Sequence, residues 1–358
     1  MTRKIHFINR LERENCGDWN CSPLPYYFSY FSQYDLLRHD IDFIDFNEIQ
    51  PEDVVILGGS GMLHVTRSFD ENICRVLARC RHVVGWSLGF NTHRGAWAQG
   101  TDFPEIPFDR FSLLTIRDVH HPSGIEHCAD PSCLHPALGT RADISRTYGV
   151  IEHKDLPLSL DLGADTMKNN RSIEEIADFI AHTETILTNS WHVAYWTQLM
   201  ERKCILVNAW STKFDFMYPP PGRISTKEGH VDTQELDAAA AAQEIPHGLR
   251  ARAIAENQAF FTRVQALVDA CGITRGSSYQ TLYLLSHVAL WNTQAKLSRI
   301  DDLAHDTQHA EQRINDLHDE IYGELHRLEE ALASEREETR RLAQALQRKL
   351  TNPFARKG

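Results

Sequence analysis

The sequence predicts an α/β protein with two Rossmann-like domains that face each other across a cleft, followed by a long C-terminal helical, coiled-coil-like extension. Three observations lead to this fold class. Short β-branched runs alternate with amphipathic stretches over the first 140 residues, the alternation restarts near residue 148, and long charged side chains dominate beyond residue 291. Such alternation is typical of parallel sheets covered by helices. The expected domains are residues 1–145, 146–291 and 292–358.

In the first domain, buried strands alternate with a crossover helix. The helix is expected over residues 68–80, where the apolar side chains share one face. The strands are expected at residues 4–9 (KIHFIN), 41–46 (IDFIDF), 53–59 (DVVILGG), 82–90 (HVVGWSLGF) and 111–118 (FSLLTIRD). The C-terminal ends of these strands should line one rim, where open α/β sheets bind ligands.

The second domain repeats the pattern on a smaller scale. Ser172 followed three residues later by Glu175 is a capping-box signature, which places a helix start there. Strands are expected at residues 148–153, 185–189 and 204–209, and helices at 172–181, from 191 onward, at 249–270 and again from about 277. Residues 219–235 are rich in Pro, Gly and polar side chains and are expected to form a loop.

The C-terminal extension carries a heptad-like seam, because apolar residues recur every three or four positions over residues 314–332. A helix over residues 300–350 would be about 75 Å long, which is too long for an ordinary globular helix. We therefore expect a homo-oligomer formed through this helix. An antiparallel hairpin folded near Ser334 and a docking arm for another protein are the alternatives.

Composition narrows the function classes. The chain has 358 residues, more than one hydrophobic core usually serves. Its net charge of −12 argues against a nucleic-acid partner, because phosphate-backbone binding needs clustered Lys and Arg. Neither a signal peptide nor a membrane span is recognisable, so we expect a cytoplasmic protein. Cys128 and Cys133 lie near several histidines and leave a metal site as an alternative, but structural zinc favours shorter spacings, and we predict no metal.

Glycines mark the end of the strand at residues 53–59. Gly58, Gly59 and Gly61 would let the backbone approach a ligand and offer N–H groups to an anion. Their spacing is not the dinucleotide fingerprint, which argues against NAD. The alternative is that these glycines merely form the turn.

Polar residues are expected at the same rim. The loop after the first strand holds Asn15, Gly17 and Asp18, before a helix expected to open near residue 22. The strand at 111–118 delivers Arg117 at its end, where it can pair with Asp118 or grip a phosphate or carboxylate with two hydrogen bonds. The neighbouring glycine loops favour anion binding.

The stretch ILTNSWHVAYW ends a buried strand with Asn189 and Ser190 and at once presents Trp191 and His192. Ser190 suits a helix N-cap, so the positive end of the helix dipole would point at the cleft with His192 in the first turn. A single His is more often structural, but this position favours a functional one. Aromatic residues that could stack on a sugar, or simply fill the core, are Trp19, Trp86, Trp191, Tyr195 and Trp196.

An ordered set of segments resembles the polysaccharide pyruvyl transferase family over about residues 4–215. These are the N-x-G-D loop at 15–18, GGSG at 58–61, RD at 117–118 and TNSWH at 188–192. The resemblance implies a GT-B-like fold and transfer of pyruvate from phosphoenolpyruvate to two hydroxyls of a sugar, as a ketal. The acceptor would belong to an exopolysaccharide or its precursor, in nucleotide-linked, lipid-linked or polymeric form, and no cofactor would be needed.

Position by position, the resemblance places the family's histidine on His192 and its arginine on Arg117, as a ligand of the donor phosphate or carboxylate. Lys154 and Lys213 lie where further basic groups could reach the donor. His192 and Asp18 are the candidates for acid and base. The glycine that usually follows the histidine is Val193 here, which would narrow the pocket mouth or shift the helix start.

Two other functions remain open at this level. A GT-B glycosyltransferase that uses a nucleotide sugar would need a ribose-binding glutamate, for which Glu152 and Glu201 are candidates. An inactive scaffold in polysaccharide assembly would act through its C-terminal helix. Deletion of residues 292–358 should abolish the function of such a scaffold, whereas an enzyme should keep its turnover.

Overall fold

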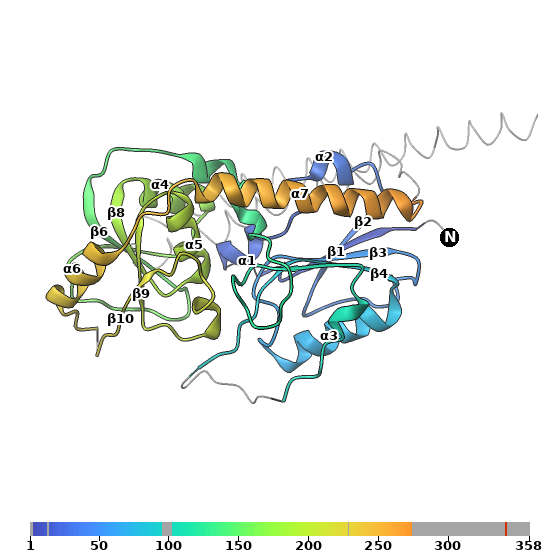
Figure 1. Cartoon of the computed structure of the whole chain (residues 1–358), viewed down its shortest axis with the longest axis horizontal. Helices are drawn as coiled ribbons and strands as arrows, with labels where there is room; N and C mark the ends of the chain where they lie inside the picture. The colour runs from blue at the N-terminus through green and yellow to red at the C-terminus, as the bar shows by residue number, and fades with distance from the viewer. Residues whose placement is uncertain (1–2, 13, 95–101, 228, 274–340, 342–358) are drawn as a thin grey trace, which may run out of the picture. The chain divides into compact units, whose positions relative to one another are not determined.

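The structure is a computed structural model that describes residues 3–12, 14–94, 102–227, 229–273 and 341. Within these residues the chain forms two parallel five-stranded sheets with helices around them, an α/β fold with two sheet domains (Figure 1). Both sheets belong to one compact unit, Met1–Thr281. The helix expected near residue 277 lies outside the described residues, and so does the extension at 292–358 except for Arg341. These elements, the domain limits and the oligomer therefore remain predictions.

The first sheet has the order β2-β1-β3-β4-β5, and every neighbouring pair is parallel. Its strands are β1 (Ile5–Asn9), β2 (Leu36–Asp40), β3 (Val54–Gly58), β4 (His82–Leu88) and β5 (Leu113–Ile116). The helices of this part are α1 (Cys16–Asn20), α2 (Phe28–Phe31), α3 (Arg67–Arg79) and the 3-10 turn η2 (Phe108–Arg110). β1 and β3 are buried along their whole length, as expected for central parallel strands.

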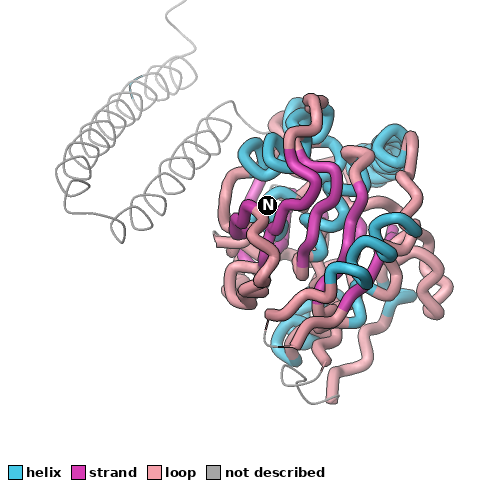
Figure 2. The backbone as a smooth tube through the Cα atoms, turned by 90° about the vertical axis from the view of Figure 1, so that its left-hand side faces the viewer, coloured by secondary structure: helices cyan, strands magenta, loops and turns pink. Residues whose placement is uncertain are grey.

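The second sheet has the order β10-β9-β8-β6-β7 and is also parallel throughout. Its strands are β6 (Arg146–Glu152), β7 (Asp165–Lys168), β8 (Thr183–Thr188), β9 (Lys203–Val207) and β10 (Gly222–Ile224). The helices are α4 (Ile173–Ala181), α5 (Trp191–Leu199), α6 (Thr233–Ala242), α7 (Leu249–Ala270) and the 3-10 turns η3 (Pro131–Leu134), η4 (Pro136–Gly139) and η5 (Thr212–Phe214). Figure 2 shows the strands side by side with helices around them.

The two sheets share one topology. In each, the first strand in the chain lies between the second and the third, so the winding direction reverses between β1 and β3 in one sheet and between β6 and β8 in the other. Doubly wound sheets bind ligands outside the carboxyl ends of the strands at such a reversal. The loops that follow β1, β3, β6 and β8 are therefore the structural place for a site.

Helix α7 ties the two sheet domains together, and Figure 1 shows it running beside both. Its Asn257 is fully buried and accepts a hydrogen bond from Trp86 Nε1 of β4 at 2.9 Å. The Asn257 amide also donates to the carbonyl of Ala129 at 2.8 Å, in the segment that leads to the second sheet. Helix α7 runs over the predicted residues 249–270, and the capping box of Ser172 and Glu175 on α4 is confirmed.

Three expectations about local structure were wrong. The second strand is 36–40, not 41–46, because the Asp40 carboxylate accepts from the Asp42 N–H and turns the chain, leaving Phe43 83% exposed. A helix begins already at Cys16, because the Asn15 side chain caps it by accepting from an N–H in its first turn. The loop at 219–235 contains a short strand, β10, paired with β9.

No helix within the described part of the chain is long and apolar enough to cross a bilayer.

Candidate functional site

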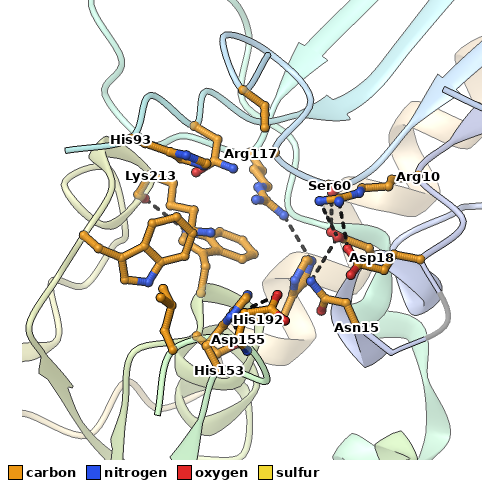
Figure 3. Close-up of a pocket in the computed structure, with 18 residues that line it drawn as sticks. Arg10, Asn15, Asp18, Ser60, His93, Arg117, His153, Asp155, His192 and Lys213 are labelled. Atoms are coloured by element: carbon orange, nitrogen blue, oxygen red, sulfur yellow. Dashed lines mark hydrogen bonds and ion pairs between the residues drawn. The ribbon is translucent and has the colours of Figure 1, made fainter. Parts of the chain in front are cut away.

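A pocket of about 210 Å³ lies where the C-terminal loops of both sheets meet (Figure 3). It is lined from the first sheet by residues that follow β1, β3, β4 and β5, and from the second by residues that follow β6, β8 and β9. Eight of the residues predicted for the site line it: Asn15, Asp18, Gly61, Arg117, Ser190, Trp191, His192 and Lys213. The reversal points of both sheets thus open into one cavity.

Arg117 and His192 are the centre of the pocket and meet across the two domains. Arg117 Nη1 is 3.1 Å from His192 Nε2 and 3.0 Å from Asp130 Oδ2. The guanidinium also lies 3.6 Å from the centroid of the Trp191 ring. Its ion-pair partner is therefore Asp130 rather than the predicted alternative, Asp118. A fully buried Arg with a carboxylate on one side and an aromatic face on the other is held rigidly.

Two glycines make room for this guanidinium. A Cβ on Gly61 would lie 3.1 Å from Arg117 Nη2, and one on Gly89 would lie 3.1 Å from its Cζ. Arg117 Nε has no hydrogen-bond partner among the described residues, so the guanidinium keeps donor capacity beyond its contact with Asp130. Gly61 therefore serves the site by admitting Arg117.

His192 is buried and lies in the first turn of α5. Because Arg117 can only donate, Nε2 of His192 accepts, and the neutral ring carries its proton on Nδ1. Burial lowers the pKa of His192, the nearby Asp130 carboxylate opposes this, and the net pKa lies below the ordinary value. The resting imidazole is thus neutral at pH 7 and able to take up a proton.

The Asp130 carboxylate lies close to both Arg117 and His192. It is fully buried, and its Oδ1 accepts from the backbone N–H and the hydroxyl of Ser132 at 3.0 and 2.7 Å. Burial raises its pKa, but His192, 3.6 Å away, and the charge of Arg117 lower it more, so that the net pKa is about 2. The carboxylate is therefore ionised at any physiological pH.

Asp18 faces His192 from α1. Its Oδ1 accepts from the Ser60 hydroxyl at 2.5 Å, and its Oδ2 accepts from the Asn15 amide at 3.0 Å. Burial raises its pKa, but His192 in its protonated form, the charge of Arg10 and the Ser60 hydrogen bond outweigh this and leave the pKa below the usual range. An ionised Asp18 can accept a proton from a hydroxyl but cannot serve as the resting acid.

Lys213 is 8% exposed and comes from the loop after β9. Its Nζ lies 4.0 Å from the centroid of the Trp210 ring, and within the described residues it forms no ion pair with a carboxylate. Burial and the charge of Arg117 lower its pKa to about 7. A buried ammonium without a carboxylate is typical of a binding or catalytic site.

Several predicted residues lie beside the pocket instead of lining it. Gly58 and Gly59 make room for Pro23 and Cys21, which lie 2.5 and 2.6 Å from an added Cβ. The Asn189 side chain serves the loop after β6, donating to Leu156 O and accepting from His153 N–H. These residues therefore position backbone segments around the cavity, the two glycines by allowing close packing and Asn189 through the hydrogen bonds of its side-chain amide.

Lys154 and Gly17 have roles other than those predicted. Lys154 Nζ is 2.5 Å from Glu12 and 3.0 Å from Asp155, so carboxylates already neutralise its charge, and it does not line the pocket. Gly17 packs against the face of His192, where a Cβ would lie 2.7 Å from His192 Cβ. The missing side chain of Gly17 is what lets the imidazole reach its place.

Val193, which stands where the resembled family has a glycine, does not line the pocket. Val193 is fully buried in the core of the second sheet domain and is not among the pocket residues. Helix α5 begins at Trp191, directly after Ser190, as predicted. Ser190 is the N-cap residue, but its hydroxyl accepts from the Asn169 amide at 3.2 Å instead of from the helix N–H groups.

Sequence reasoning missed several pocket residues. The polar and aromatic ones among them include Arg10, Glu12, Ser60, His153, Asp155 and Trp210. Each of these residues follows a strand whose position was predicted to within a few residues. Polar residues after β1, β3, β6 and β9 could therefore have been added to the candidate site, because ligands bind at the carboxyl ends of such strands. Asp130 does not follow a strand directly; it is the N-cap residue of η3, a position that predicts a turn and not a place in the site.

No group of three or more His, Cys, Asp or Glu side chains in the described part of the chain is arranged to hold a metal ion. Cys128 and Cys133 are buried free thiols, and burial raises the pKa of Cys128 to about 12. Thiols of this kind are small core residues.

Comparison with known proteins does not assign a family. No protein-family model and no curated protein matches the chain. A solved structure of a functionally uncharacterised protein from Klebsiella pneumoniae is 14% identical, covers 63% of this chain and 93% of its own, and has a TM-score of 0.40. Two structures of the wall teichoic acid polymerase TagF are 10% and 9% identical, cover 83% of this chain and 89% and 90% of their own, and have TM-scores of 0.30 and 0.29. Similarity at this level carries no functional conclusion.

Proposed function

We propose that this protein transfers pyruvate from phosphoenolpyruvate to two hydroxyls of a sugar, forming a pyruvate ketal and inorganic phosphate. The observation that carries the proposal is the convergence of Arg117, Lys213 and His192 on one small cavity, opposite the ionised Asp18. Phosphoenolpyruvate bears a phosphate and a carboxylate on three carbons, so its site needs several cationic donors within a few ångströms.

The charges in the pocket suit such a donor. Lys213 has no carboxylate partner among the described residues, and Arg117 uses only part of its donor capacity on Asp130. Glu12, in contrast, is paired with both Arg10 and Lys154, and Asp155 is paired with Lys154. The cations that carboxylates compensate least therefore lie on the Arg117 and Lys213 side of the cavity.

The reaction begins with protonation of the methylene carbon of phosphoenolpyruvate, which makes C2 electrophilic. A bound anion favours the protonated form of His192, and when it draws the Arg117 N–H away from Nε2, the proton on that nitrogen can be delivered. The first sugar hydroxyl adds to C2 as Asp18 takes its proton. Phosphate leaves, and the second hydroxyl adds to the same carbon. One hydroxyl proton ends on the new methyl group and the other on the released phosphate, so the equation balances.

The size of the pocket favours this donor over a nucleotide sugar. Pockets for drug-sized ligands span about 300–1,000 Å³, and this cavity holds about 210 Å³. Neither candidate for a ribose-binding glutamate supports the alternative. Glu152 accepts from the Leu158 N–H at 2.8 Å and Glu201 accepts from the Gly248 N–H at 3.1 Å, and neither lines the cavity.

Phosphate release tests the proposal. The full-length protein is incubated with phosphoenolpyruvate and a panel of sugar acceptors, and we expect phosphate only when an acceptor with two suitably placed hydroxyls is present. His192→Asn should lower kcat by about 10²- to 10⁴-fold, since it removes the proton-transferring group. His247→Asn, at an exposed position outside the pocket lining, is the matched control and should leave kcat unchanged. Equal rates in the two variants would refute the assignment of His192.

A further inference from the structure

The two buried cations of the pocket are both held against tryptophan rings. Arg117 lies 3.6 Å from the Trp191 centroid and Lys213 lies 4.0 Å from the Trp210 centroid. The two pairs are linked, because Trp191 Nε1 donates to the backbone carbonyl of Lys213 at 3.1 Å. They differ in one respect: Arg117 also has the Asp130 carboxylate, whereas Lys213 has no carboxylate partner among the residues the structure describes.

The ammonium of a lysine as buried as Lys213 needs compensation, because burial of a charge is costly. A carboxylate would supply it, but would also cancel the charge that an anionic ligand needs. An aromatic face stabilises a cation by its quadrupole and leaves the net charge in place. Trp210 is suited to this task, since its Nε1 donates to Asn189 O at 2.9 Å and fixes the ring.

We propose that Trp210 is a positioning residue that holds the Lys213 ammonium in the cavity without neutralising it, and thereby sets the affinity of the pocket for an anionic ligand. The role of Lys213 as the partner of the donor rests on the proposed function. The cation–π contact itself does not, and it can be measured without any ligand.

Several other titratable or charged groups near Lys213 act on its pKa. Arg117 and Arg10 oppose its protonation, Asp18 favours it, and His153 faces it from the loop after β6. Burial and the charge of Lys213 lower the pKa of His153 to about 4, so this ring is already neutral at the pH near 7 where Lys213 titrates. Removal of the Trp210 ring should therefore act on Lys213 directly.

The experiment follows the titration of the Lys213 side chain by NMR in the full chain, with Lys213→Gln to assign the signal. In Trp210→Leu, which keeps an apolar group but no π face, we expect the pKa of Lys213 to fall by about 1, and the affinity for phosphoenolpyruvate at pH 7 to fall about 5- to 30-fold. Trp210→Phe should retain most of both. Phe46→Leu is the matched control, because it removes a comparable contact with Arg75, 3.8 Å from the ring, outside the pocket lining.

An unchanged or raised pKa of Lys213 in Trp210→Leu would overturn the inference, whatever the ligand does. If that variant does not fold, a site-specific fluorinated tryptophan at position 210 keeps the shape and weakens the π face, and the pKa of Lys213 should fall with each added fluorine. Failure of the unaltered protein to bind phosphoenolpyruvate, with the Lys213 titration behaving as expected, would refute the proposed function and leave the role of Trp210 standing.

Discussion

Gly17→Ala should abolish most of the activity while leaving the fold intact. Gly17 has ordinary helical geometry in α1, so Ala is locally favourable there by about 1 kcal/mol. The added Cβ would overlap the imidazole of His192 and come within 2.7 Å of His192 Cβ, where ordinary contacts begin at 3.4 Å. Relief requires a shift of roughly 1 Å, which breaks the 3.1 Å contact between His192 and Arg117, and a displacement of that size can cost on the order of 100-fold in rate.

The assay is phosphate release under saturating phosphoenolpyruvate, together with urea unfolding of the same preparation. Gly139→Ala is the control, because its Cβ would meet only the end of the flexible Arg250 side chain, 3.0 Å away. We expect Gly17→Ala to lose about 100-fold in kcat with a midpoint of unfolding close to that of the control. Activity close to that of the control would show that the position of His192 does not matter.

Three further perturbations test other parts of the site. Asp130→Asn should lower the free energy of unfolding in urea by about 3–5 kcal/mol at pH 7, because it leaves Arg117 buried without its carboxylate. Since the pKa of Asp130 is lowered to about 2, the stability that this carboxylate contributes is present above about pH 4 and is lost as the pH falls toward 2. The variant should lack this part of the acid dependence. Binding of phosphoenolpyruvate should weaken as the pH rises through about 7, where Lys213 loses its proton, whereas in Lys213→Gln calorimetry should show no such loss over the same range. Val193→Gly, which restores the residue of the resembled family, should destabilise the fold by about 3 kcal/mol through lost burial and helix propensity and leave phosphoenolpyruvate affinity unchanged; a gain in affinity would place Val193 at the pocket after all.

The sequence was most informative where hydrophobic pattern and local chemistry agree. Helix α7 and the capping box of α4 follow from apolar periodicity and from the Ser172–Glu175 spacing, both of which act within a few residues. The strand at 36–40 was missed because the neighbouring run IDFIDF alternates more clearly, although the Asp40 turn ends the strand before it. A side-chain hydrogen bond of this kind leaves little trace in a hydrophobicity pattern.

The candidate site was predictable in its central residues but not in their partners. Arg117, His192, Asp18 and Lys213 all follow strands, and the cavity brings them together. Lys154 looked equally suitable, yet its charge is taken by Glu12 and Asp155, which no spacing rule reveals. The pairing of Arg117 with Asp130, rather than with the adjacent Asp118, depends on how an irregular loop packs beneath α5, and that is a matter of tertiary structure.

Calorimetric titration with phosphoenolpyruvate, and separately with UDP- and GDP-sugars, tests which donor the pocket takes. We expect phosphoenolpyruvate to bind to the unaltered protein and nucleotide sugars not to compete with it for the pocket. Arg117→Lys should weaken binding about tenfold or more, because a lysine cannot reproduce the planar, stacked guanidinium. Binding of a nucleotide sugar with no binding of phosphoenolpyruvate would contradict the proposed function.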